Sequence, residues 1–451
     1  MSRSRDMKDL TKGNIFKTFF LFGFPLVLSG LLSETYNLID TAIAGRFLGE
    51  RGLAAIGATS PLITFLSSTF WGFGSGACIY VANLFGQGEH KKIKNTVYTT
   101  YLYMLIACVA VAVLCIALYK PLFALLQIEE SLHKDALTYF AVYMAGFFFI
   151  MLSANGLYLM NALGISSFPF YMSLISAGIN VIGNIVCVVL LKTGVVGLAI
   201  STVLSALIVD IFYIAKFKKC LKEMGVDGHK TRISFHAIKR TFPFSLPNTA
   251  QQMVMYFSTI LISPLVNGLG VSATASYAVV LQVFNFVNAV YCQSSRSFTN
   301  YTAQCVGKGQ TENIKKGVGV GLMQSIGFTL PFMLIACLLH KPVCSLFLKA
   351  DASIETIRYS YLFCSNYLPF ILFNAVNNIF HGLFRGTKAA AHLFGSTCFG
   401  SLSRFIASFI LIRYYGMEGF FLGWAISWVL EAILCVTLYF IGKWKPKTTT
   451  Y

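Results

Sequence analysis

The chain has 451 residues, of which 56% are hydrophobic and only 12% are charged. Soluble domains usually carry about twice that charged fraction, so the composition excludes an ordinary soluble protein and indicates a surface that mostly faces lipid. The formal net charge of +18 does not indicate nucleic-acid binding, because the basic residues lie in alternate loops and do not form one patch with interleaved aromatic residues.

Long apolar stretches run through the whole chain. A helix needs roughly 20 apolar residues to cross about 30 Å of hydrocarbon. The sequence therefore predicts an all-α membrane protein with about twelve transmembrane helices, separated by short polar breaks. The expected spans are 16–42, 53–83, 96–118, 136–161, 169–191, 195–215, 242–267, 273–303, 317–339, 357–384, 390–412 and 419–441.

Basic residues mark one side of the predicted bundle. They fall in the N-terminal tail, in every second loop, in a connector near 216–240 and in the C-terminal tail. Because positively charged loops stay on the cytoplasmic side, we expect a multi-pass protein of the cell membrane with both termini cytoplasmic. No small-residue cleavage site follows the first apolar run, so we expect no signal peptide to be removed. The twelve cysteines are scattered through apolar segments and are interpreted as packing residues.

The two halves of the chain repeat each other. The loop FGQGEHKKIKN aligns with VGKGQTENIKK at an offset of 221 residues, and an offset of 222 later pairs Asn155 with Asn377 and Gly194 with Gly416. Each half holds an even number of predicted spans, so the halves are parallel repeats, an architecture of several transporters. We expect two six-helix lobes around a central cavity, with a solute site between them and alternating access by rocking. The predicted segments are an N-terminal tail, an N-lobe, a basic linker, a C-lobe and a C-terminal tail, at 1–15, 16–217, 218–240, 241–442 and 443–451.

The N-terminal half has a polar interior around one acid, Asp40. A charge at the centre of a membrane costs at least about 2.5 to 3.5 kcal/mol, so an acid there indicates a function. Asn180 and Asn184 lie one turn apart on the fifth span, and Thr202 lies on the sixth. These oxygen-rich side chains predict an ion-coupling cluster that holds either a proton on Asp40 or a sodium ion. Exclusion of water favours the proton, whereas a bound cation favours the ionised carboxylate.

Glu34 is a second acid on the first span. It lies about 120° around the helix from Asp40 and therefore faces a different neighbour. We include it among the ion-coupling candidates, with a satisfied ion pair as the alternative. Asp210 is interpreted as an interfacial residue near the cytoplasmic end of its span.

The C-terminal half is polar mainly through amides, and Glu431 is its one carboxylate within a span. Amide stripes are typical of a wet substrate cavity, and Arg296 would balance a buried acid or attract an anionic group. Helix packing by the same amides remains an alternative. The predicted substrate cavity, taken from both halves, consists of Tyr36, Asn37, Asn155, Gln251, Gln252, Gln282, Asn285, Arg296, Asn374, Asn377, Asn378 and His381.

Pro25 on the first span and Pro247 on the seventh occupy corresponding places in the two halves. Each proline frees a backbone carbonyl and permits a bend. Pro25 is therefore a candidate gating bend, and a kink fixed for packing is the alternative.

The segment DLTKGNIFKTFFLFGFPLVLSGLLSETYNLIDTAIAGRFLG, the following LAAIGATSPL and the FGQG loop together resemble the bacterial branch of the multidrug and toxic compound extrusion (MATE) family. The likeness extends to INVIGN and GVVGLAIST in the first half and to FRGTK and GMEGFFLGWAIS in the second. The resemblance implies a secondary antiporter that exports organic, often cationic compounds in exchange for protons or sodium ions.

In such families the Asp of the IDT motif, here Asp40, belongs to an ion site of the N-lobe, and Asn180 and Thr202 match its partners. The family usually has Asp where this chain has Asn184, so one negative charge is missing and coupling to protons is favoured over sodium. The expected partners are small organic substrates, the coupling ion and the lipid bilayer, with no nucleic acid, no cofactor, no bound metal and a monomeric state.

Two other functions compete with antiport. A flippase for a lipid-linked precursor would use a related fold, but the mostly neutral predicted cavity does not suit a polyanionic headgroup. An intramembrane enzyme would need a nucleophile and a base or a metal set, and the sequence has no HExxH, no GxSxG and no paired catalytic acids. We therefore expect no enzymatic activity, and a channel is disfavoured because two repeated lobes suit alternating access better.

Overall fold

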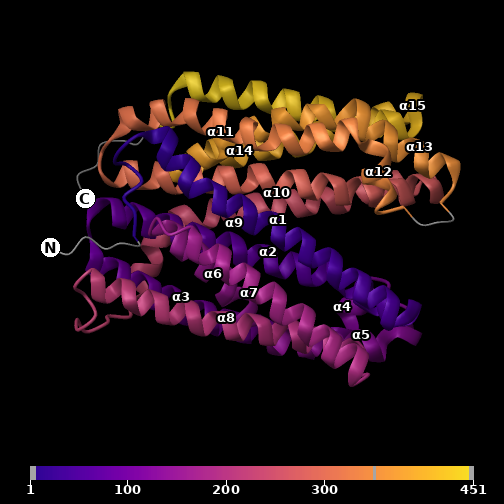
Figure 1. Ribbon diagram of the computed structural model, residues 1–451, viewed down its shortest axis with the longest axis horizontal. Coiled ribbons are helices and arrows are strands. Elements are labelled where there is room, and N and C mark those ends of the chain that lie inside the picture. Colours follow the sequence, from indigo (N-terminus) through magenta and orange to yellow (C-terminus); the bar gives the residue numbers. More distant parts are fainter. Residues whose placement is uncertain (1–6, 349–351, 446–451) are drawn as a thin grey trace. The chain divides into compact units, whose positions relative to one another are not determined.

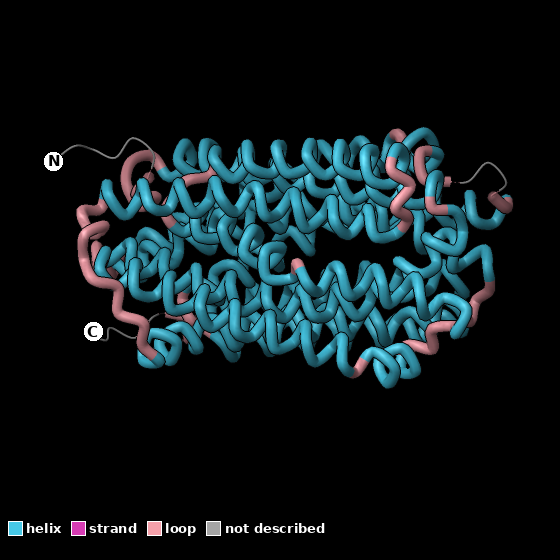
Figure 2. Tube along the Cα trace, turned by 90° about the horizontal axis from the view of Figure 1, so that it is seen from below, coloured by secondary structure: helices cyan, strands magenta, loops and turns pink. Residues whose placement is uncertain are grey.

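Helices form nearly all of the chain. The computed structural model describes residues 7–348 and 352–445, and in these ranges Figure 2 shows helices joined by loops, with no strand. A helix satisfies its own backbone hydrogen bonds, and this is necessary in a membrane because hydrocarbon has no hydrogen-bonding groups. The predicted all-α fold is confirmed.

The first half of the chain contains the helices α1 to α8, labelled in Figure 1. Their bounds are α1 Ile15–Phe47, α2 Gly49–Gln87, α3 His90–Ala117, α4 Tyr119–Leu125, the 3₁₀ turn η1 Glu130–Leu132, α5 His133–Ala145, α6 Phe147–Ala162, α7 Ser167–Asn184, the π-helix η2 Ile185–Leu190 and α8 Val195–Glu223.

The second half contains α9 to α15. Their bounds are α9 Phe235–Asn267, α10 Val271–Gly307, α11 Thr311–Leu338, α12 His340–Ser345, α13 Ile354–Leu362, the π-helix η3 Phe363–Tyr367, the 3₁₀ turn η4 Leu368–Phe370, α14 Ile371–Gly386 and α15 Ala390–Ile441. The helix α14 packs against α10, α11 and α15, and α8 packs against α5, α6 and α7.

Two compact units divide the chain. Among the described residues, the first unit holds residues 7–9 and Leu32–Thr249, and the second unit holds Leu10–Leu31 and the residues from Ala250 onward. The helices α1 and α9 therefore contribute to both units, whereas the predicted lobe limits of 16–217 and 241–442 keep each helix whole.

Packing explains why α1 and α9 are shared. In the second unit the ring of Phe19 packs edge-on against Tyr301 with centroids 4.7 Å apart, and Gln324 donates to the Phe19 carbonyl at 3.0 Å. In the first unit Ser245 donates to the carbonyl of Phe73 at 2.9 Å, and Asn248 donates to the Ser75 hydroxyl at 2.6 Å.

The length and composition of the helices account for only part of the expected twelve spans. Within the described residues eight helices are long and apolar enough to cross a membrane, and α5 with α6, bent by 51°, makes a ninth span. The long helix α15 covers the last two predicted spans, and a break at Gly416 separates them. The two other predicted spans correspond to α9 and to the interrupted segment from α13 to α14.

The backbone confirms the repeat at its most unusual residues. Gly194 has φ 66° and ψ −145°, and its partner at an offset of 222, Gly416, has φ 55° and ψ −132°. Side chains disfavour this region strongly, so glycine is required in both halves. The short helices α4 and α12 also begin 221 residues apart, at Tyr119 and His340.

We expect Gly416→Ala to lower the thermal unfolding temperature in detergent, because an alanine in this conformation costs about 1 to 3 kcal/mol. A Cβ added there meets no atom within 4 Å, so a lower unfolding temperature would result from backbone strain and not from a steric clash.

Gly395→Ala is the matched control, because it lies on the same helix with equally open surroundings and no positive φ. Alanine has the higher helix propensity there, so this variant should be neutral or slightly more stable. Equal unfolding temperatures for the two variants would contradict the assigned break.

Candidate functional site

The predicted ion-coupling residues of the first unit form one hydrogen-bonded chain. The side-chain amide nitrogen of Asn184 donates to the Asp40 carboxylate at 2.5 Å and to the Asn180 carbonyl oxygen at 2.9 Å. The Asn180 amide donates in turn to the Thr202 hydroxyl at 3.3 Å. The Tyr36 hydroxyl lies within hydrogen-bonding reach of both Asp40 and Thr202.

Three helices position this cluster. The helix α1 places Tyr36 and Asp40 one turn apart, and α7 does the same with Asn180 and Asn184, because residues four apart share a helix face. The third helix, α8, carries Thr202. Asn184 is the last residue of α7 before the π-helix η2. Single π turns within helices are frequent at functional sites.

The members of the cluster differ in burial. Asn180 and Asn184 are fully buried, whereas Asp40 and Thr202 are half-buried. The carbonyl oxygen of Asn184 has no hydrogen-bond partner among the described residues. The site therefore combines one carboxylate, one unused amide oxygen and two hydroxyl groups, which suits a proton or a small hard cation.

Three other predicted residues of the first unit lie apart from this chain. Glu34 is half-buried and makes no hydrogen bond or ion pair with the residues that the structure describes. Asn37 is exposed. Asn155 is fully buried, donates to the Met151 carbonyl at 2.7 Å, and fills the space beside Gly74 where a Cβ would collide with its amide.

The second unit gathers several of the predicted cavity residues around an acid. Glu431 lies 3.3 Å from the imidazole of His381 and accepts a hydrogen bond from Asn377 at 3.2 Å. The other imidazole nitrogen of His381 faces Gln251 at 3.3 Å. Sequence reasoning assigned Glu431 no role. The criterion applied to Asp40, an acid within a predicted span, would also have identified Glu431.

The remaining polar residues of this unit bind other partners. Asn374 donates to the Tyr291 hydroxyl at 2.8 Å, and Asn378 donates to the Asn374 carbonyl at 3.0 Å. Arg296 lies 3.4 Å from the Gln293 amide oxygen. Gln252, Gln282 and Asn285 are half-buried and make no hydrogen bond to Glu431 or His381 in the described structure.

The proline in α1 does not interrupt the helix. The helix is continuous from Ile15 to Phe47 through Pro25. Ser29 donates its hydroxyl to the Pro25 carbonyl at 2.9 Å. The gating role of Pro25 stays a prediction.

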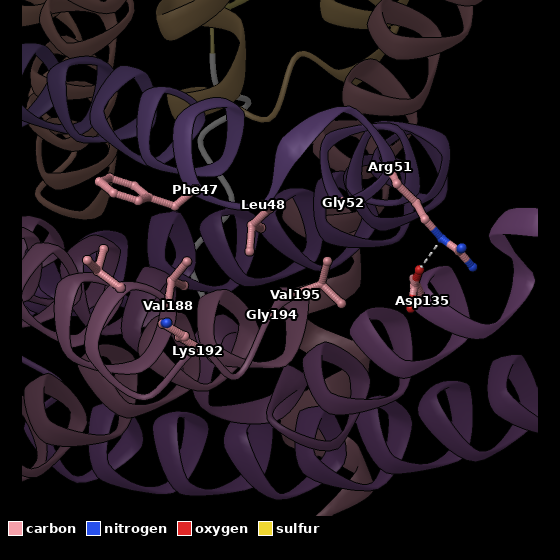
Figure 3. Close-up of a pocket in the computed structure, with 10 residues that line it drawn as sticks. Phe47, Leu48, Arg51, Gly52, Asp135, Val188, Lys192, Gly194 and Val195 are labelled. Atoms are coloured by element: carbon pink, nitrogen blue, oxygen red, sulfur yellow. Dashed lines mark hydrogen bonds and ion pairs between the residues drawn. The ribbon is translucent and has the colours of Figure 1, made fainter.

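A pocket of about 400 Å³ opens elsewhere in the first unit (Figure 3). It lies where the end of α1 and the start of α2 face the connection from η2 to α8. Its Arg51 is already paired with Asp135 at 2.8 Å, and its other lining consists of Lys192 and of aliphatic, aromatic and glycine residues. It includes none of the residues of the Asp40 cluster, so we do not assign the coupling site to it.

Comparison with known proteins finds matches over most of the chain. The MatE family model matches residues 25–186 and 247–410. The "Probable multidrug resistance protein YoeA" of Bacillus subtilis (strain 168) is 25% identical over 69% of each chain. The "Multidrug export protein MepA" of Staphylococcus aureus (strain MRSA252) is 22% identical over 90% of each chain.

The fold is also that of solved structures. One is described as "Outward-facing conformation of a multidrug resistance MATE family transporter of the MOP superfamily", with a TM-score of 0.91, 18% identity and 98% of each chain covered. Another, "Crystal structure of MATE in the straight conformation", has a TM-score of 0.88 at 18% identity, covering 96% of this chain and 97% of that one.

Proposed function

Because the chain belongs to the MATE family of multidrug efflux transporters, we propose that it exports organic, mainly cationic, drug-like compounds in exchange for protons or sodium ions. The observation that carries the proposal is the chain of hydrogen bonds from Asp40 through Asn184 and Asn180 to Thr202. Alternating access of the two repeated lobes would move the substrate, and no cofactor is needed beyond the transported ion.

Asp40 is the coupling group in this proposal. An acid within a span is costly unless it is paired or used, and among the described residues no basic side chain forms an ion pair with Asp40. Its partners are an amide donor and a hydroxyl, which stabilise it without neutralising it. A carboxyl group in such surroundings can take up and release an ion during transport.

The arrangement favours protons over sodium. Asn184 turns its amide nitrogen toward the carboxylate, so a donor occupies a position where a cation would require an oxygen ligand. With Asn at residue 184, the cluster also carries one carboxylate and no second charge to offset the loss of water around a sodium ion.

We expect Asp40→Asn to reduce ethidium export from proteoliposomes to the background rate, because the amide cannot exchange a proton. The assay applies a pH gradient and, separately, a sodium gradient, and expression should remain nearly unchanged. The matched control is Asp227→Asn, an exposed carboxylate of the connector.

Full activity of Asp40→Asn under either gradient would contradict the coupling role. Absence of export by the wild-type protein under both gradients would favour the lipid flippase instead. Transport of a lipid-linked precursor in the same vesicles would then establish that alternative.

We expect Asn184→Asp to raise sodium-driven export relative to proton-driven export, because it adds a second carboxylate beside Asp40. Two adjacent carboxylates repel each other unless a cation or a proton lies between them. Asn267→Asp, at the exposed end of α9, is the matched control. An unchanged ratio of the two driven rates would contradict a cation site at the cluster.

We further propose that the protein is a monomer in the cell membrane with both termini cytoplasmic. The basic loops and the even number of predicted spans support this orientation. Green fluorescent protein fused to the C-terminus should fluoresce, whereas alkaline phosphatase fused there should be inactive. The opposite pair of results would reverse the orientation.

A further inference from the structure

A second polar network lies in the second unit, and antiport through Asp40 does not use it. Its members are Gln251 on α9, His381 and Arg385 on α14, and Ser396 and Glu431 on α15. His381 is 6% exposed and Glu431 is 9% exposed, and Gln251 and Ser396 are fully buried. A buried histidine beside a buried acid can hold a proton in more than one arrangement, so the hydrogen bonds around it decide its state.

Arg385 fixes the orientation of the Gln251 amide. Its Nε and Nη2 atoms both donate to the Gln251 carbonyl oxygen, at 3.0 and 2.9 Å. A guanidinium group only donates hydrogen bonds, so the amide cannot be reversed without placing donors against donors. The Gln251 nitrogen must therefore face His381 Nδ1 at 3.3 Å, and it also donates to the Thr397 hydroxyl at 3.1 Å.

This orientation selects one tautomer of His381. Because Nδ1 receives a hydrogen bond, it carries no proton, and the single ring proton lies on Nε2. The Nε2 atom faces the Glu431 carboxylate at 3.3 Å and the Ser396 hydroxyl at 3.1 Å. Ser396 uses its own hydrogen on the His392 carbonyl at 2.7 Å, so its oxygen is free to accept from His381.

Glu431 is arranged as an acceptor. One of its oxygens faces His381, and the other accepts from the Asn377 amide at 3.2 Å. Gly400 on the neighbouring part of α15 leaves the space for this carboxylate, since a Cβ there would collide with it. The other charged or titratable groups near the pair are Arg385, Arg404, Cys435 and, from α10, Tyr291.

A second proton on His381 is incompatible with the observed contact to Gln251. An imidazolium would pair well with Glu431, but its new N–H at Nδ1 would point at the N–H of the amide. Arg385 holds the other end of that amide, so reversal of the amide does not relieve the conflict. Gln251 is the second residue that α9 contributes to this unit, after Ala250.

We propose that His381 is a second proton-binding residue of the protein, and that a proton taken up at its Nδ1 atom displaces the Gln251 amide and loosens α9 at its entry into the second unit. The proposal rests on the proposed function only in giving this proton a role in antiport. Proton binding at His381 is independent of Asp40 and requires neither a gradient nor a substrate.

The test is ¹⁵N NMR of histidine-labelled protein in lipid nanodiscs, titrated from pH 9 to pH 5. The His381 signals are identified by their loss in His381→Gln. At pH 9 we expect a neutral ring with its proton on Nε2, and on acidification a proton on Nδ1. A ring with its proton on Nδ1 at pH 9, or no titration over this range, would overturn the proposal.

Substitutions of Gln251 test the coupling between the two side chains. Gln251→Glu replaces the opposing donor by an acceptor of the same shape, so His381 should bind its second proton at least tenfold more tightly, a shift of one pH unit. Gln251→Leu removes both the donor and the carbonyl that Arg385 binds, without adding an acceptor, and should give a smaller shift in the same direction. Gln310→Glu, an exposed residue of the same unit, is the matched control and should give no shift.

Identical His381 titrations in wild type, Gln251→Glu and Gln251→Leu would overturn the coupling between His381 and Gln251. Thermal unfolding curves would first show that all three proteins are folded. The outcomes also separate this inference from the function. A His381 titration without ion-driven ethidium export would leave the proton site in place and contradict the antiport, whereas proton-driven export without the titration would do the reverse.

Discussion

Hydrocarbon offers no hydrogen bonds, and this constraint bears on the backbone and on every charge within the spans. The backbone meets it by forming helices over nearly all described residues. Two carboxylates, Asp40 and Glu431, meet it through amide donors on neighbouring helices, which stabilise a charge without neutralising it. Asn184 holds Asp40 in the first unit, and Asn377 holds Glu431 in the second.

The sequence alone predicted the parts of the structure that follow from local rules. Apolar length gave the spans, and the four-residue spacing of Asn180 and Asn184 placed both on the face of α7 that reaches Asp40. Contacts between distant segments were harder to foresee. Glu431 and His381 lie 50 positions apart in sequence, and neither lies in a motif that names the other. The division of α1 and α9 between two units likewise depends on packing, which helical periodicity does not encode.

The two repeats have kept their backbone more closely than their polar chemistry. Gly194 and Gly416 adopt the same rare conformation. The paired residues Asn155 and Asn377 are both fully buried, yet they differ in role. Asn155 packs against Gly74, whereas Asn377 holds a carboxylate. Backbone geometry is therefore the shared inheritance of the two halves, and the polar contacts of their paired residues differ.

The π-helix η3 lies in the part of the second half that is one residue longer than its counterpart in the first half. The starts of α5 and α13 are still 221 residues apart, whereas Asn155 and Asn377 are 222 apart. The second half therefore has one residue more than the first between Ile354 and Asn377, the interval that contains η3 at Phe363–Tyr367. A wider helical turn accommodates one extra residue without lengthening a loop. The wider turn at η3 therefore absorbs the difference of one residue and leaves Asn377 buried on α14, as Asn155 is on α6.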